Sequence, residues 1–334
     1  MQEKMWGLLV HLSKNMWYPI KTELKEHFDD DFWNWILEES VKAGINTIIL
    51  DVGDGIEYAT HPEISIKGAW SRNRVRQELK KCREMGLTLI PKLNFATPHD
   101  MWLGEYARMI STNTYYRVAN DLIKEVYEVF GHPQYIHLGF DEEDARHVRN
   151  NELAIYRQGE LFWHDLRFLM DCVTDTGAKP FIWGCPLYRH FEEYQAHIGV
   201  DDCILSPWAY NAIKKEHWTP VESRAEYVAY YNEGDYAKLG IKYVEEDPYL
   251  VMFREVSPKV VAGGYKIVPC ASVYNRCDYN HMDMIEYFKE MTPDDQFVGF
   301  MSAPWCSTVP TERSRQFYEE TFRFFKEAKD AYNA

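Results

Sequence analysis

The chain has 334 residues, of which 46% are apolar, which is enough for one large domain or for two domains of ordinary size. Its formal net charge is −15 and no lysine and arginine cluster is present, so nucleic acid and anionic membranes are poor partners. No run of about 18 apolar residues occurs, and we therefore expect no membrane-spanning helix.

Short apolar runs rich in β-branched and aromatic residues recur along the chain and predict eight strands. Continuous runs of this kind are typical of parallel strands that are covered on both faces. In chain order, the predicted strands are 5–12, 45–52, 87–95, 135–140, 179–184, 203–210, 266–274 and 297–305.

Helical patterns lie between these strands. In residues 31–43, for example, Phe32, Trp33 and Ile36 fall on one face, and Gly44 follows as a C-terminal cap. The same pattern of a helix, a glycine and a strand recurs several times. The other predicted helices are 71–85, 113–130, 160–176 and, at the end of the chain, 311–332.

This alternation predicts an α/β fold, a (β/α)8 TIM barrel, and we assign residues 1–334 to one such domain. A doubly wound open sheet is the alternative, but no glycine-rich GxGxxG turn follows the first strand. Residues 212–262 are longer than one connection requires. We expect them to form a helical insertion between strands six and seven.

The seven cysteines are scattered without a CxxC pair, so neither a zinc knuckle nor a disulfide framework is indicated. No signal peptide is visible. A predicted strand that begins at about Trp6 would fit an extracytoplasmic protein whose leader has been removed.

Active sites of barrel enzymes lie at the carboxyl ends of the strands, so the residues at these points are the candidates. The fourth strand, in the stretch YIHLGFDEED, ends in four acids at 141–144. Because alternate strand residues point to opposite faces, Asp141 and Glu142 can serve one site only where the strand unwinds. The other candidates are Asp51, Asn94, His99, His137, Trp183, Trp208, Tyr274, Arg276 and Trp305.

Carboxylates beside aromatic walls suit carbohydrate chemistry. Cleavage of a glycosidic bond needs an acid for the leaving oxygen and a second group that meets the positive charge at the sugar carbon. Where two carboxylates share a pocket, we expect one pKa to be pushed up, which leaves a proton donor at neutral pH. Each residue also has a structural interpretation, because acids often begin solvated loops and His137 or a tryptophan can belong to the core.

These residues resemble the catalytic domain of glycoside hydrolase family 20, the β-N-acetylhexosaminidases. Residues 137–142 match the family's strand-four signature His-x-Gly-x-Asp-Glu. Residues 61–99 resemble the stretch from the loop of the second strand to a proline-led third strand and a histidine, and Trp305 is similar to the tryptophan that ends strand eight. The resemblance covers roughly residues 5–310.

The resemblance implies retaining, substrate-assisted cleavage of a terminal N-acetylhexosamine, in which the substrate's acetamido oxygen attacks the sugar carbon. Glu142 would be the general acid/base, Asp141 would orient the acetamido group, and Tyr274 would hydrogen-bond its oxygen. The partner would be a glycan or glycoconjugate, with no cofactor and no metal. Trp183, Trp208 and Trp305 would wall the sugar pocket, and His99 and His137 would be supporting polar residues.

The chain departs from the family pattern where sugar hydroxyls are held. Residues 11–14 (HLSK) stand where a strand-one arginine is usual, and residues 91–94 (PKLN) replace Pro-Glu-x-Asp. Residues 305–307 (WCS) lack the glutamate of Trp-x-Glu. These changes leave a glycan-binding protein without catalytic activity as an alternative.

Two further classes of enzyme have to be weighed against these hypotheses. A retaining glycosidase with a protein nucleophile would use Asp51, Asp54 or Asp278, at about 5–5.5 Å from the acid. A metal-dependent hydrolase is disfavoured because no His-x-His occurs on strand one. Its ligands would come from His11, Asp51, His99, His137 and Asp141.

Overall fold

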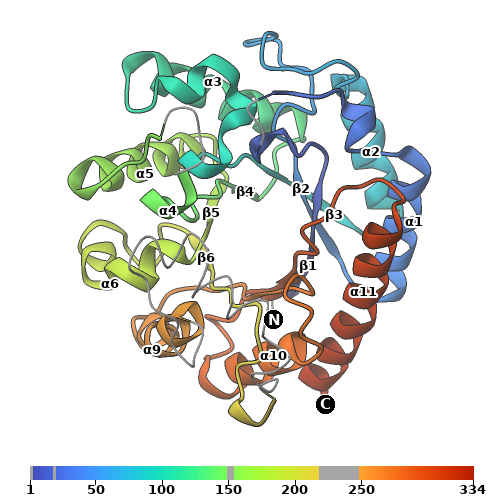
Figure 1. Ribbon diagram of the computed structural model, residues 1–334, viewed down its shortest axis with the longest axis vertical. Coiled ribbons are helices and arrows are strands. Elements are labelled where there is room, and N and C mark those ends of the chain that lie inside the picture. The colour runs from blue at the N-terminus through green and yellow to red at the C-terminus, as the bar shows by residue number, and fades with distance from the viewer. Residues whose placement is uncertain (1–2, 18–19, 149–153, 218–247) are drawn as a thin grey trace, which may run out of the picture.

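The computed structural model describes residues 3–17, 20–148, 154–217 and 248–334. Within these residues, eight parallel strands are arranged in the order β6-β5-β4-β3-β2-β1-β8-β7, and helices surround them (Figure 1). Parallel bridges between Leu205 and Ile267 and between Trp208 and Cys270 close the sheet into a barrel. The strands are β1 Met5–His11, β2 Thr47–Asp51, β3 Thr88–Lys92, β4 Tyr135–His137, β5 Lys179–Trp183, β6 Ile204–Ser206, β7 Cys270–Ala271 and β8 Gly299–Ser302.

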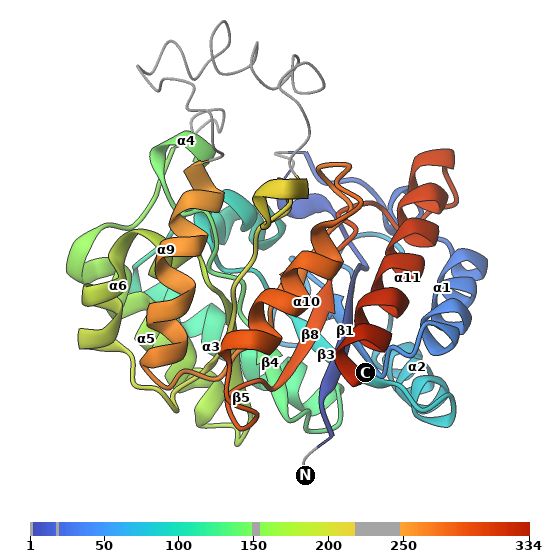
Figure 2. The same ribbon diagram turned by 90° about the horizontal axis from the view of Figure 1, so that it is seen from below.

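The helices alternate with the strands along the chain, and α1, α2 and α11 lie side by side on one flank (Figures 1 and 2). Among the helices that the structure describes, none combines the length and the apolar character needed to cross a bilayer. The α-helices are α1 Asp30–Lys42, α2 Arg72–Glu84, α3 Asn113–Val129, α4 Ala145–Val148, α5 Gly159–Thr174, α6 Cys185–His197, α9 Pro248–Ala262, α10 Asn280–Met291 and α11 Glu312–Asn333. Short 3₁₀ helices cover Asn15–Trp17, Leu24–Glu26, Thr97–His99, Met101–Arg108 and Lys215–His217.

The prediction of a TIM barrel is confirmed, as is the long segment between β6 and β7. Helix α9 forms the end of that segment, whereas the part of the predicted insertion at 218–247 lies outside the described residues. The assignment of the whole chain to a single domain stays a prediction.

Local signals in the sequence explain where helices begin and end. The Asp29 side chain accepts a hydrogen bond from the Phe32 amide at 2.8 Å and so caps α1, an interaction that typically stabilises a helix by about 1 kcal/mol. Gly44, with φ of 79°, ends the same helix in the left-handed conformation that favours glycine. Between these ends, Phe32, Trp33 and Ile36 are buried against the barrel core.

The barrel interior is filled in two layers. Apolar side chains such as Leu9, Ile49 and Ile90 form the first layer. One step nearer the carboxyl ends, strand register aligns four polar residues on adjacent strands, and all four are no more than 1% exposed. This buried polar row consists of His11, Asp51, Lys92 and His137.

Candidate active site

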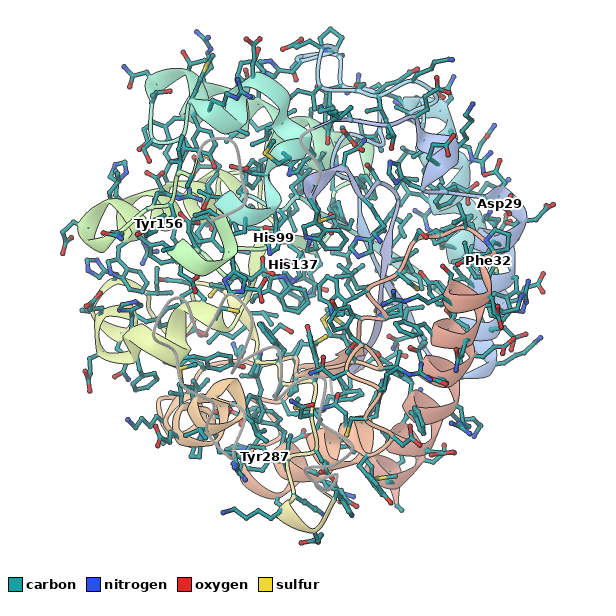
Figure 3. All side chains as sticks on the ribbon, in the orientation of Figure 1. Asp29, Phe32, His99, His137, Tyr156 and Tyr287 are labelled. Atoms are coloured by element: carbon teal, nitrogen blue, oxygen red, sulfur yellow. The ribbon has the colours of Figure 1, made fainter. Side chains whose placement is uncertain are left out.

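A cavity of about 640 Å³ is lined by residues that follow the carboxyl ends of the strands. It brings together residues that follow six of the strands, β1, β3, β4, β6, β7 and β8. His99, one of its residues, lies near the barrel axis in Figure 3. The predicted site residues that line the cavity are Asn94, His99, Asp141, Glu142, Trp208, Tyr274 and Trp305.

Strand β4 unwinds early, at the position that the two neighbouring acids require. It ends at His137, and Gly139, Phe140 and Glu142 have φ angles of 71°, 66° and 58°. A Cβ atom on Gly139 would lie only 2.0 Å from Asn94 Oδ1. Glycine in the signature therefore allows both the left-handed turn and the close approach of Asn94 to the acids.

Asp141 is held from two sides. Asn94 Nδ2 donates to Asp141 Oδ1 at 2.9 Å, and His99 Nε2 lies 3.4 Å from Asp141 Oδ2. Asn94 is itself oriented, because its Oδ1 accepts a hydrogen bond from the Ala96 amide at 3.1 Å. The Asp141 carboxylate is thus fixed and nearly buried, at 7% exposure, at the base of the cavity.

Glu142 lies between two histidines. His99 Nε2 is 3.3 Å from Glu142 Oε2, and His147 Nε2 is 3.4 Å from Glu142 Oε1. Burial raises the pKa of Glu142, but its interactions with His147 and His99 outweigh burial and hold the pKa below the ordinary value. The expected rise in the pKa of one of the two carboxylates therefore does not occur at Glu142, because two histidines approach it more closely than the sequence indicates.

The pKa of His147 is shifted in the opposite direction to that of Glu142. Burial lowers its pKa, but hydrogen bonds to Asp144 and Glu142 outweigh burial and raise the pKa to about 9. His147 Nδ1 lies 3.0 Å from Asp144 Oδ1, which also accepts the His147 amide at 3.3 Å. At neutral pH the His147–Glu142 pair therefore holds one proton, mainly on the imidazole.

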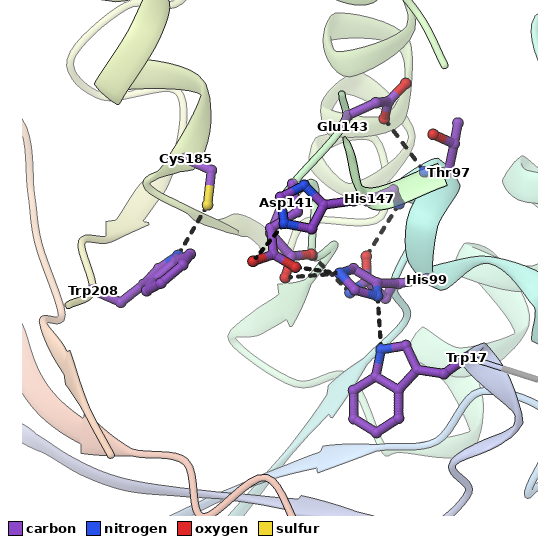
Figure 4. Close-up of polar contacts among 12 residues, drawn as sticks. Trp17, Thr97, His99, Asp141, Glu143, His147, Cys185 and Trp208 are labelled. Atoms are coloured by element: carbon purple, nitrogen blue, oxygen red, sulfur yellow. Dashed lines mark hydrogen bonds and ion pairs between the residues drawn. The ribbon is translucent and has the colours of Figure 1, made fainter. Parts of the chain in front are cut away.

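Trp17 orients the other histidine, as Figure 4 shows. Its Nε1 donates to His99 Nδ1 at 2.8 Å, so the Nε2 proton of His99 points at Asp141 and Glu142. Burial lowers the pKa of His99 and the charges of the two carboxylates raise it, with a net rise. The Trp17 donor opposes that rise, because it occupies the lone pair that a second proton would need.

The remaining acids of the run serve the loop itself. Glu143 turns away from the cavity to Arg157, whose Nε and Nη2 donate to it at 2.6 and 2.8 Å. Arg157 Nη2 also donates to the Phe95 carbonyl at 2.6 Å, which ties the loop after β4 to the loop after β3. Removal of one partner from so buried an ion pair typically costs several kcal/mol.

Four predicted site residues do not line the cavity. Asp51 contacts Lys92 Nζ at 2.5 Å inside the barrel, and Arg276 forms two hydrogen bonds with Glu320, at 2.8 and 3.0 Å. The rings of His137 and Trp183 are packed together, with centroids 4.7 Å apart, below Trp305. Lys92 stands where the family pattern has the glutamate of Pro-Glu-x-Asp. In this chain its ammonium pairs with the Asp51 carboxylate, which accounts for this departure from the pattern.

Trp17, His147 and Tyr210 line the cavity without having been predicted. Tyr210 stacks on Trp208, with ring centroids 4.8 Å apart, and extends the aromatic wall. Tyr210 is the last residue of the sixth predicted strand, so the strand-end argument that selected Trp208 also points to it. Trp17 ends a single 3₁₀ turn that no sequence pattern predicts. The only local signal for His147 is its position three residues after Asp144, whose side chain accepts the His147 amide.

One group of side chains could hold a cation. Donor atoms of His99, Asp141 and Glu142 lie within 4.8 Å of one another, a set of oxygen and nitrogen donors that suits a divalent metal. The other ligands considered for a metal, His11, Asp51 and His137, share the barrel interior with the Lys92 ammonium. That fixed positive charge disfavours a second cation there.

No model of a protein family and no curated protein sequence matches this chain. Its fold is similar to that of Dispersin B, with 13% identity, a TM-score of 0.61, and coverage of 99% of this chain and 100% of that one. A family 20 exo-β-N-acetylglucosaminidase from Vibrio harveyi in complex with N-acetylglucosamine has 13% identity and a TM-score of 0.60. A β-N-acetylhexosaminidase from Bacteroides fragilis has 12% identity and a TM-score of 0.61.

The chain covers different shares of these proteins. It spans all of Dispersin B but only 54% of the Vibrio enzyme and 65% of the Bacteroides enzyme. The resemblance to family 20 catalytic domains is thus confirmed at the level of the fold, over almost the whole chain.

Proposed function

We propose that this chain is a glycosidase of the β-N-acetylhexosaminidase type, which removes a terminal N-acetylhexosamine or a related sugar with retention of configuration. The observation that carries the proposal is the position of Asp141 and Glu142. They lie together in a cavity walled by Trp208 and Trp305, on a barrel with the fold of family 20 domains. Aromatic walls with a few convergent polar groups suit a sugar ring.

In the proposed mechanism the substrate supplies its own nucleophile. Asp141, which Asn94 and His99 hold in place, accepts the N–H of the 2-acetamido group and directs the carbonyl oxygen at the anomeric carbon. Glu142 protonates the leaving oxygen and then removes a proton from water. Tyr274 and Tyr210 both line the cavity, and either hydroxyl could hold the acetamido oxygen.

The proton for the leaving group would come from the His147–Glu142 pair. In the free protein the histidine holds it, because the pKa of His147 is raised to about 9 and that of Glu142 is lowered. A sugar that enters beside Glu142 and separates the two groups removes the interaction that keeps the carboxylate ionised. The proton then passes to Glu142 at the point where it is used.

The positions of other acids disfavour a protein nucleophile. Asp51 is paired with Lys92, and Asp54 accepts a hydrogen bond from Asn15 at 3.1 Å and contacts Lys21 at 3.4 Å. Neither these acids nor Asp278 are among the described residues that line the cavity. This supports the substrate-assisted mechanism over one with a covalent glycosyl-enzyme.

A second candidate function is glycan binding without turnover. Two observations favour it: the free protein keeps Glu142 ionised, and the chain lacks the arginine and glutamate that hold sugar hydroxyls in the family pattern. Tight binding of a glycan that is never cleaved, at any pH between about 4 and 9, would support this candidate.

The decisive experiment is hydrolysis of a panel of aryl glycosides by wild-type protein and by Glu142→Gln. We expect cleavage of an N-acetylglucosaminide or N-acetylgalactosaminide, and a loss of about 10²–10⁴-fold in the variant. Cleavage only of glucosides, galactosides or glucuronides would contradict the substrate-assisted mechanism. A parallel assay with a chelator tests the His99–Asp141–Glu142 donor set, and loss of activity there would indicate a metal-dependent reaction.

A further inference from the structure

The wall of the cavity formed by the loop after β1 and the start of α11 carries two cations, in a chain whose net charge is −15. These are Lys14 and Arg313, which line the same cavity as Glu142. We propose that this wall binds an anionic substituent on the sugar, a sulfate, phosphate or carboxylate group. The inference rests on the proposed function and narrows it to acidic amino sugars.

Neither cation is neutralised by an acid among the described residues. Their contacts are with aromatic rings: Lys14 Nζ lies 5.2 Å from the Trp17 ring centroid, and the Arg313 guanidinium lies 5.0 Å from that of Phe317. By contrast, Lys21 is within 3.4 Å of Asp54, as is usual for lysines of an acidic protein. The rings hold the two cations in place and leave their hydrogen-bond donors available.

The two charges also act on one another. Burial lowers the pKa of Lys14, and the nearby positive charge of Arg313 lowers it further. Two like charges that converge on a half-enclosed cavity destabilise each other, and an anion placed between them removes that repulsion.

The rest of this wall is suited to an anion. Ser307, Thr311 and Ser314 line this wall with hydroxyl groups, of which Thr311 donates to Ser314 Oγ at 2.8 Å and Ser307 lies 3.5 Å from Ser314. The first turn of the 22-residue helix α11 adds the positive end of its dipole. Glu312, the acid of that turn, is exposed and is not among the cavity-lining residues. Ser307 stands where the family's Trp-x-Glu has its glutamate, whose carboxylate would repel an anion.

The test compares aryl N-acetylglucosaminides that are neutral or carry a 6-sulfate or 6-phosphate, with a uronic-acid analogue as the carboxylate arm. We expect wild-type kcat/KM to be about tenfold or more higher for an anionic sugar than for its neutral counterpart. This ratio should fall at least about fivefold in Lys14→Gln and in Arg313→Gln, and it should shrink as NaCl rises from about 0.05 to about 0.5 M. The anionic sugar with the largest kcat/KM relative to its neutral counterpart identifies whether the wall prefers a sulfate, a phosphate or a carboxylate.

Arg323→Gln is the matched control. Arg323 lies on the same helix, is exposed, and stacks on Phe324 at 4.4 Å much as Arg313 stacks on Phe317, but it does not line the cavity. We expect the ratio to stay unchanged in this variant. An equal fall in Arg323→Gln and Arg313→Gln would overturn the inference, since the effect would then come from overall charge.

Titration calorimetry of Glu142→Gln with the same sugars separates this inference from the proposed function. Preferential binding of an anionic sugar without turnover by the wild type would overturn the proposed glycosidase and support the anion site. Turnover without any preference for an anionic sugar would support the glycosidase and overturn the anion site. Absence of binding to every sugar of the panel would overturn both.

Discussion

At the scale of single residues, histidines rather than the second carboxylate set the electrostatics of the candidate acid. Glu142 contacts His99 at 3.3 Å and His147 at 3.4 Å, and these two contacts outweigh the burial that would otherwise raise its pKa. The proton that a glycosidase needs is therefore held next to Glu142 rather than on it. This arrangement makes the two histidines testable parts of the mechanism.

Replacement of His147 by glutamine should move the alkaline limb of the pH–rate profile. In the wild type the pair retains its proton up to about pH 9, the value to which the pKa of His147 is raised. Without this histidine only Glu142 holds the proton, so we expect the alkaline limb of kcat/KM to move down by at least about 2 pH units. His164→Gln, on an exposed histidine of α5, is the control, and an unchanged limb in His147→Gln would contradict the proton-donor role.

Replacement of Trp17 by phenylalanine removes the donor to His99 Nδ1 and keeps an aromatic ring in the cavity wall. We expect kcat to fall about tenfold without a fall in melting temperature, because His99 loses its fixed tautomer. Nitrogen chemical shifts of His99 should report the neutral Nε2–H form in the wild type and a mixture in the variant. Trp35→Phe, at a ring that stacks on Phe32 outside the barrel, should change neither quantity.

At the scale of elements, apolar runs and helix-ending glycines are local signals, and for this reason the order of strands and helices could be predicted from the sequence. Strand β7 shows the limit of such signals. Residues 266–274 read as one strand, but only Cys270–Ala271 forms a ladder with β8, whereas Ile267 makes single bridges. The length of a ladder depends on its neighbours, which the run itself does not encode.

The same distinction applies to the candidate site. The signature at 137–142 predicted where Asp141 and Glu142 would lie, because the positions of strand ends follow from the barrel. It did not predict that Glu143 would turn to Arg157, 14 residues further along, or that Arg276 would pair with Glu320. Such pairings are tertiary contacts between segments without a shared pattern, so only the structure reveals them.

Gly139→Ala tests the turn that presents the two acids. The alanine would have to adopt the left-handed conformation of Gly139, with φ of 71°. Its Cβ would also lie only 2.0 Å from Asn94 Oδ1. We expect a loss of about 3 kcal/mol or more in the free energy of unfolding, with loss of activity as Asn94 is pushed from Asp141.

Gly86→Ala isolates the backbone component of this effect. Gly86 has a similar φ of 77°, but nothing lies within 4 Å of its Cβ position. Its replacement should cost only about 1 kcal/mol and leave activity intact. Equal losses in the two variants, measured by urea unfolding, would show that contact with Asn94 is unimportant.

At the scale of the whole molecule, the barrel is layered from apolar filling through the buried polar row to the cavity. The row carries ionic charge, because the Asp51 pKa is lowered: burial raises it, but Lys92 and His11 outweigh burial. Beside this pair, burial and the charge of Lys92 hold the His137 pKa well below its ordinary value. The interior thus keeps some histidines neutral, while the cavity above keeps another protonated.

This division predicts a maximum of stability near neutral pH. Burial lowers the pKa of His11, His137 and His281, the last to about 3, so each contributes stability that is present above about pH 6.5 and is lost as pH falls. The raised pKa of His147, about 9, has the opposite effect: its contribution is present below about pH 6.5 and is lost as pH rises through 9. Each group changes the free energy of unfolding by at most about 1.4 kcal/mol per pH unit.

Urea unfolding between about pH 4.5 and 9.5 should therefore show a stability that declines on both sides, and two variants should each flatten one side. His281→Asn should reduce the decline on the acid side only, because a neutral side chain in that site takes up no proton in the unfolded chain. His147→Gln should reduce the decline on the alkaline side only. His132→Asn, at a side chain that is 60% exposed, is the control for both. If His147→Gln reduced the decline on the acid side instead, the pKa of His147 would not be raised in the folded protein. The proposal that this histidine holds the catalytic proton would then be wrong.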